Sequence, residues 1–223
     1  MHIKLNIEIE QNVINESGLD KKYIENLVND ILGMAINYFG KPKIEVLNLK
    51  LIGVVNMPPY CQLIDSNSGK FTINLSYFKN ETFIPILAHE IAHLLNAEIF
   101  DAYVEGLNNV LAEIITKVYD NNSKDFDFPE ANKREQFYKY SFLMMKEIVE
   151  EIGINVFNNF LSYAVETNGN SKINHIHINN WLNNLDKSKV ESFKKIVKKY
   201  QFDIFCSMYD SSLSNYWFDY NFQ

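Results

Sequence analysis

Residues 83–95 read FIPILAHEIAHLL, an apolar run that contains the pattern H-E-x-x-H. If this run forms a helix, His89 and His93 lie one turn apart on the same face and can share a metal ion. Glu90 then lies beside them, where it can take a proton from a metal-bound water. The stretch therefore predicts a metal-binding helix, and the rest of the chain is best interpreted around it.

The surrounding residues favour a helix at this position. Thr82 is a suitable N-cap, and Pro85 then falls in the first turn, where a missing backbone donor costs little. Apolar side chains recur at helical spacing roughly opposite the histidines, at Leu87, Ile91 and Leu94. Because two imidazoles and a carboxylate are costly to bury without a partner, their presence in an apolar helix favours a bound metal over chance.

Composition limits the classes of protein that the chain can belong to. It has 223 residues, of which 47% are hydrophobic and 22% charged, as in globular proteins with a sizeable core. The net charge of −7 argues against a nucleic-acid-binding surface. No apolar run approaches the roughly 18 residues that would cross a membrane, and the alternating N-terminus does not resemble a signal peptide. With only two cysteines, Cys61 and Cys206, we expect a cytoplasmic protein without disulfides.

The first 120 residues alternate between strand and helix patterns. Apolar alternation predicts a strand at 3–9, and helical spacing followed by Gly40 predicts a helix at 20–39. The segment 44–55 is apolar enough for a central strand. Turn formers at 65–70 predict a hairpin, and the preceding Pro58 and Pro59 favour an edge strand. Further along, Asn96 is a suitable helix stop and Asp101 an N-cap for a helix at 102–119.

The second part of the chain is expected to be mainly helical. The polar segment 120–129 suggests a boundary, so we expect an α+β core at 1–125 and a helical region at 126–223. Within that region the spacing of apolar residues predicts helices at 130–152, 154–165, around 181–182 and at 186–200. The tail at 202–223 is aromatic without a clear period.

A zinc site usually takes three protein ligands and a water, so two histidines need a third partner. On one unbroken helix Glu105 would lie about 18 Å from His93, too far to share an ion, so the chain must turn back between residues 96 and 101. Glu105 would then lie in the first turn of the second helix, and Glu113 about two turns further along. The acidic candidates that follow the histidines are Glu98, Asp101, Glu105 and Glu113.

These two motifs resemble those of the gluzincins, a group of zinc metallopeptidases. In that group a glutamate in a short E-G or N-E element on the next helix is the third ligand, and here the second helix begins Tyr103-Val104-Glu105-Gly106-Leu107. The order of predicted elements also resembles the group's minimal, zincin-like core. The resemblance implies that His89, His93 and Glu105 bind Zn²⁺ and that Glu90 is the general base.

The function expected from this resemblance is zinc-dependent hydrolysis of a peptide or protein substrate. A zinc-bound water would be the nucleophile, and the hairpin edge could hold an extended peptide by strand addition. The oxyanion that forms needs a donor, for which Tyr103, His175 and His177 are candidates. For Tyr103 a packing role is the alternative, and for the two histidines a solvated loop or strand.

Two other interpretations remain. The chain could be a non-catalytic, metal-stabilised scaffold that binds a partner through its long helical region. Residues 89–100 also resemble the metal helix of peptide deformylases, which hydrolyse an amide. That family takes a cysteine ligand from an upstream E-G-C element, whereas Cys61 stands in Pro59-Tyr60-Cys61-Gln62, where a structural role is expected.

Overall fold

The computed structural model describes residues 4–40, 46–54, 57–65, 68–75, 80–95, 101–120, 124–128, 130, 132–160, 175–209 and 218. The chain divides into two compact units. The first comprises Met1–Asn37, Lys41–Ala97 and Leu111–Ser123, and the second Tyr38–Gly40, Glu98–Val110 and Lys124–Gln223. The first unit holds a mixed sheet with helices and the second is helical where it is described, so the predicted α+β class is confirmed.

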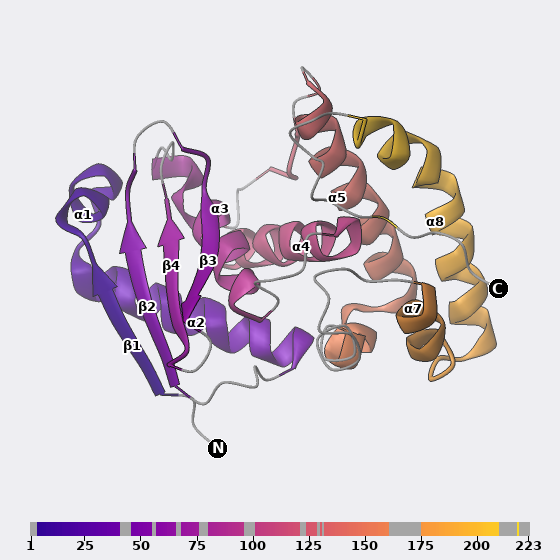
Figure 1. Ribbon diagram of the computed structural model, residues 1–223, viewed down its shortest axis with the longest axis horizontal. Helices are drawn as coiled ribbons and strands as arrows, with labels where there is room; N and C mark the ends of the chain where they lie inside the picture. The colour runs from indigo at the N-terminus through magenta and orange to yellow at the C-terminus, as the bar shows by residue number, and fades with distance from the viewer. Residues whose placement is uncertain are drawn as a thin grey trace. The chain divides into compact units, whose positions relative to one another are not determined.

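The four strands of the first unit form one sheet in the order β1-β2-β4-β3 (Figure 1). Strands β1, β2 and β4 run parallel to one another, whereas β3 runs antiparallel to β4. The strands are β1 (Lys4–Ile9), β2 (Val46–Ile52), β3 (Tyr60–Asp65) and β4 (Lys70–Asn74). The predictions of a central strand, a hairpin and an edge strand after the prolines are therefore confirmed.

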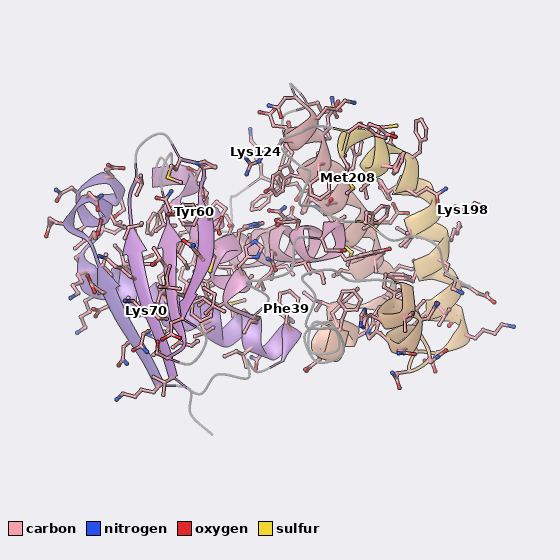
Figure 2. The ribbon with its side chains drawn as sticks, viewed as in Figure 1. Phe39, Tyr60, Lys70, Lys124, Lys198 and Met208 are labelled. Carbon is pink, nitrogen blue, oxygen red and sulfur yellow. The ribbon has the colours of Figure 1, made fainter. Side chains whose placement is uncertain are left out.

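Apolar residues at every second position explain this sheet. Leu47, Leu49 and Leu51 of β2 are buried, as are Phe71 and Ile73 of β4. The period of two places them on one face of neighbouring strands. Figure 2 labels Tyr60 and Lys70, the residues at which the two strands of the hairpin begin.

Helix α2 (Lys21–Phe39) matches its predicted range closely. The Asp20 carboxylate accepts a hydrogen bond from the Tyr23 backbone N–H at 2.8 Å, and Gly40 follows the helix with φ 90°. The apolar residues at helical spacing are mostly buried: Ile24, Leu27, Val28, Ile31, Leu32 and Ala35 are buried, and Ile36 is partly buried. A short helix that the sequence interpretation missed, α1 (Gln11–Ser17), precedes it and ends at Gly18, whose φ is 67°.

The elements that follow the hairpin are α3 (Asn80–Ala92), the 3-10 turn η1 (His93–Leu95) and α4 (Ala102–Tyr119). The prediction for α4 is confirmed at both ends. The predicted start of α3 was wrong, because the helix begins at Asn80, so Thr82 lies inside its first turn and Pro85 in its second. Pro85 has no N–H to donate to the carbonyl four residues earlier, and the helix continues past it. The predicted stop at Asn96 falls outside the described residues.

The described helices of the second unit are α5 (Lys133–Ile152), the 3-10 turn η2 (Ile154–Asn159), α7 (His175–Leu182) and α8 (Lys187–Ser207). Asn132 and Glu135 form a capping box at the start of α5. Two expectations were wrong: residues 175–177 begin a helix, and α8 continues into the tail as far as Ser207. The predicted continuation at 161–165 falls outside the described residues. None of the described helices has the length and apolar character needed to cross a membrane.

Helices α5 and α8 are joined by a charged contact that predicts how stability depends on pH. Glu147 of α5 accepts hydrogen bonds from Lys199 at 2.5 Å and from the Tyr200 hydroxyl at 2.9 Å. The hydrogen bond from Lys199 holds the pKa of the Glu147 carboxyl below its ordinary value. A depressed carboxyl pKa contributes stability above the unfolded-state pKa, and this contribution is lost as the pH falls through the folded-state pKa.

Glu147→Gln is therefore expected to lower the free energy of unfolding at pH 7, with the difference from the wild type disappearing in acid. Because both partners are partly exposed, the effect is small and screened by salt. Denaturant unfolding at pH 7 and pH 3 measures it, with Glu150→Gln, an exposed carboxylate on the same helix, as the control. An equal difference at both pH values would show that the charge of Glu147 contributes nothing.

Candidate metal centre

His89 and His93 turn their rings toward each other, as the one-turn spacing predicts. His89 lies in α3 and His93 in η1, and their Nε2 atoms are 3.1 Å apart. Two nitrogens bound tetrahedrally to one zinc ion, each at about 2.05 Å, lie roughly 3.3 Å apart. The histidine pair is therefore already close to the spacing of two ligands on a common ion.

The apolar side of this helix is buried. Leu87 and Ile91 are fully buried and Leu94 is 4% exposed, so the predicted stripe is confirmed. The two histidines are only partly buried. Packing of the stripe therefore fixes the rotation of the helix, and that rotation leaves the imidazole rings accessible.

Glu105 lies in the first turn of α4 because Asp101 starts that helix. The Asp101 carboxylate accepts a hydrogen bond from the Tyr103 N–H at 2.8 Å, and its carbonyl accepts one from the Glu105 N–H at 3.0 Å. The predicted N-cap is thus confirmed. A carboxylate in the first turn also interacts favourably with the helix dipole, although Glu105 is only 3% exposed.

His89, His93 and Glu105 form a group that could hold a metal ion. Each offers one ligand atom, and these atoms all lie within 4.8 Å of one another. Two imidazole nitrogens and one carboxylate oxygen are a common donor set for zinc that leaves a fourth position open. The donor chemistry fits, and small side-chain movements would bring the three atoms to tetrahedral spacing.

Glu113 has a different environment from Glu105. It is 4% exposed, it lies two turns further along α4, and its carboxylate pairs with Lys117 at 3.2 Å. Within the described part of the chain, the group of potential ligands contains Glu105 and not Glu113. The structure therefore favours Glu105 among the candidates, while Asp101 serves as the N-cap and Glu98 falls outside the described residues.

Glu90 is 5% exposed, which puts its carboxylate in a poorly solvated position beside the histidines. Burial, and secondly the charge of Glu90, raise the pKa of the Cys61 thiol well above its ordinary value. Cys61 lies in β3, which contacts the helix that carries Glu90. Cys61 is not a member of the group of potential metal ligands found among the described residues. The arrangement differs from the cysteine-containing ligand set of a deformylase.

Tyr103 and His177, the proposed oxyanion donors, are both buried. Tyr103 is fully buried and its ring stacks on Phe193, with centroids 6.0 Å apart. His177 is 3% exposed within α7, so the expectation of a solvated loop was wrong. The side chain of His175 lies outside the described part. A packing role accounts for the position of Tyr103, and we assign it no chemical step.

In the sequence, Gly106 was singled out only as the glycine of the E-G element, and the structure shows why a glycine is needed at this position. A Cβ at this position would lie 2.3 Å from the Ser141 carbonyl oxygen of α5 and 2.5 Å from Cγ of Met145. Glycine is therefore required where α5 crosses α4, immediately after Glu105. The sequence does show a glycine next to an acidic residue in an apolar helix. The spacing of residues along that helix, however, does not reveal which other helix packs against the glycine.

No protein-family model, no curated protein and no solved structure matches the chain. The chemistry of the site therefore rests on the residues of this chain and on the short motifs that they form.

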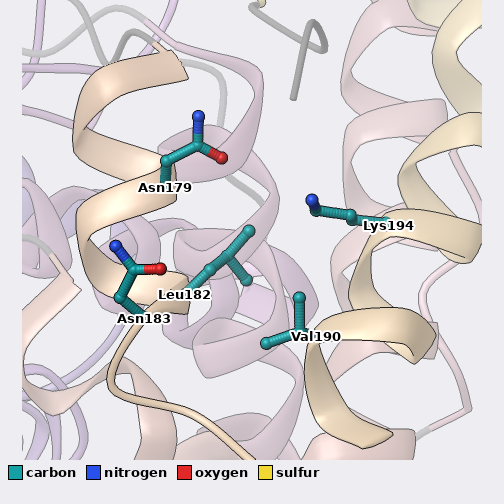
Figure 3. Close-up of a pocket in the computed structure, with 5 residues that line it drawn as sticks. All are labelled: Asn179, Leu182, Asn183, Val190 and Lys194. Carbon is teal, nitrogen blue, oxygen red and sulfur yellow. The ribbon is translucent and has the colours of Figure 1, made fainter. Parts of the chain in front are cut away.

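A pocket of about 290 Å³ also occurs in the second unit, and its lining includes none of the three potential ligands (Figure 3). It is formed by α7 and the residue after it together with α8, and its lining residues are Asn179, Leu182, Asn183, Val190 and Lys194. Among the described lining residues there is no carboxylate, imidazole or thiol, so they provide no set of metal ligands, and Lys194 is the one ionisable side chain among them.

Proposed function

We propose that the chain is a zinc-dependent metallopeptidase with a zincin-like core, in which His89, His93 and Glu105 hold the ion. The observation that carries this proposal is the convergence of three ligand atoms of the correct types within 4.8 Å. One of the three comes from a helix separated in sequence from the other two. Glu90, between the histidines in sequence, is the general base.

The bound zinc ion would polarise the scissile carbonyl and lower the pKa of the attacking water. The carboxylate of Glu90 accepts the proton of that water and later delivers it to the leaving amine. Glu90 is buried next to the histidine pair, and the two histidines are themselves only partly buried.

Strand β3 is the proposed binding edge for the peptide. It pairs with β4 on one side and is the last strand in the order of the described sheet. An extended peptide could add to this edge through main-chain hydrogen bonds, with side-chain selectivity from alternate residues. Strand β3 also contacts α3, the helix that carries Glu90.

The test is Glu90→Gln, which removes the base but keeps the size of the side chain. Hydrolysis of a fluorogenic peptide panel is expected to fall by about 10²–10⁴-fold, the usual contribution of a general base. Zinc content should not change, because Glu90 is not a ligand. Glu113→Gln is the matched control, since it also removes a buried carboxylate and should leave hydrolysis unchanged.

Two results would contradict the proposal in different ways. Undiminished hydrolysis by Glu90→Gln would remove Glu90 as the base. A zinc-loaded wild type that cleaves no member of the panel would instead support the non-catalytic, metal-stabilised scaffold.

A further inference from the structure

The first turn of α4, which belongs to the second unit, is held there by two contacts on one side of the helix, because Tyr103 and Gly106 are three residues apart. At Gly106 the backbone of α5 lies against α4, as the 2.3 Å approach of the Ser141 carbonyl to a built Cβ shows. At Tyr103 the contact is aromatic. Tyr103 and Gly106 are two residues before and one residue after Glu105, so both contacts act on the turn that presents this carboxylate.

Three aromatic rings surround Tyr103. Phe193 of α8 stacks on it at 6.0 Å, Phe160 meets it edge-on at 6.2 Å, and Phe218 lies closest, with centroids 5.3 Å apart. Phe218 is 7% exposed and is the one residue described beyond Tyr209. The tail of the chain therefore has a buried anchor, and that anchor contacts the turn that carries Glu105.

The geometry of a helix makes Glu105 sensitive to this anchor. Residues two apart point in nearly opposite directions, so Tyr103 holds the side of α4 away from Glu105. A carboxylate about 6 Å from the helix axis moves by about 1 Å when the helix turns by roughly 10°. Zinc–ligand distances tolerate only about 0.2 Å, so a loosened first turn weakens the site even if the fold persists.

We propose that Phe218 is a positioning residue for the metal centre: by packing on Tyr103 it fixes the rotation of α4 and so the direction of Glu105. This inference rests on the metal-binding part of the proposed function and adds to it that the end of the chain supports the third ligand. Phe218 touches neither the ion nor the substrate.

The experiment compares Phe218→Ala with Phe202→Ala in the full-length protein. Phe202 is the matched control, because it is also a phenylalanine in the last part of the chain, near the end of α8, but is 72% exposed. The readout is zinc affinity, measured by competition with a chromophoric chelator, together with the visible absorption of bound Co²⁺, which reports ligand geometry. Phe218→Ala should bind zinc about 10–100-fold more weakly, which is the usual loss when a residue that orients a metal ligand is removed. Phe202→Ala should bind zinc as tightly as the wild type. Phe218→Leu keeps part of the apolar volume but loses the ring contact with Tyr103, so its zinc affinity should lie measurably below that of the wild type and above that of Phe218→Ala, with a shifted Co²⁺ spectrum.

Each outcome decides the inference. Wild-type zinc affinity in Phe218→Ala, or equal weakening in Phe202→Ala, would overturn the positioning role and leave the metal site standing. If Phe218→Ala does not fold, Phe218→Leu carries the test, and an affinity and Co²⁺ spectrum identical to the wild type would overturn the role. A wild type that binds no zinc would overturn both this inference and the proposed function.

Discussion

Gly106→Ala is expected to lower the thermal midpoint of the protein by roughly 4–8 °C. The added Cβ would lie 2.3 Å from a backbone oxygen of α5, which cannot turn away as the end of a side chain could. Overpacking of this kind costs about 1–3 kcal/mol or more, against a helix-propensity gain of about 1 kcal/mol for alanine. Because the clash is with backbone, we take the cost at the upper end of that range, about 3 kcal/mol, and the net loss of about 2 kcal/mol gives the predicted shift for a chain of this size.

Gly33→Ala in the middle of α2 is the control for this prediction. A Cβ at Gly33 meets nothing within 4 Å, so only the propensity gain remains and the midpoint should rise by a few degrees. Differential scanning calorimetry of the two variants therefore tests whether the same glycine-to-alanine substitution lowers the thermal midpoint at Gly106 and raises it at Gly33. A rise in both would show that α5 does not pack against α4 at Gly106.

Glu105→Ala and His89→Ala are expected to reduce zinc affinity by more than about 10²-fold. Each removes one of the three proposed protein ligands, and this loss should exceed the roughly 10–100-fold that follows from losing an outer partner of a ligand. The measurement is competition with a chelator of known affinity. The folded structure should persist in each variant, because the cores of both units lie in other residues.

Glu113→Ala separates the two glutamates of α4. This residue is buried and paired with Lys117, so its removal should cost stability but leave zinc affinity close to the wild type. The reverse pattern, with weak binding in Glu113→Ala and normal binding in Glu105→Ala, would reassign the third ligand.

The parts of the fold that the sequence predicted are those with strong local signals. The bounds of α4 followed from the Asp101 cap and the apolar spacing after it, and the hairpin from turn formers between two alternating runs. The proximity of the two histidines was predicted in the same way, whereas Glu105 was preferred to Glu113 only because its motif resembles that of the gluzincins. His89 and His93 are neighbours on one turn, and the 12-residue separation of Glu105 from His93 required the chain to return.

The parts that the sequence did not predict depend on contacts between distant residues. Tyr103 was a candidate oxyanion donor, but three aromatic rings from later segments pack around it. His177 has no local signal for burial, and the continuation of α8 was hidden because its apolar residues include exposed ones such as Phe202. Propensity and spacing describe one element, whereas these features depend on the element that packs against it.

The most direct test of this account is the metal content of wild-type protein purified without chelators, measured by inductively coupled plasma mass spectrometry. A metal centre held by His89, His93 and Glu105 predicts one zinc ion per chain, lost in parallel from His89→Ala, His93→Ala and Glu105→Ala. Protein that carries no stoichiometric metal and takes up none from added zinc would contradict it.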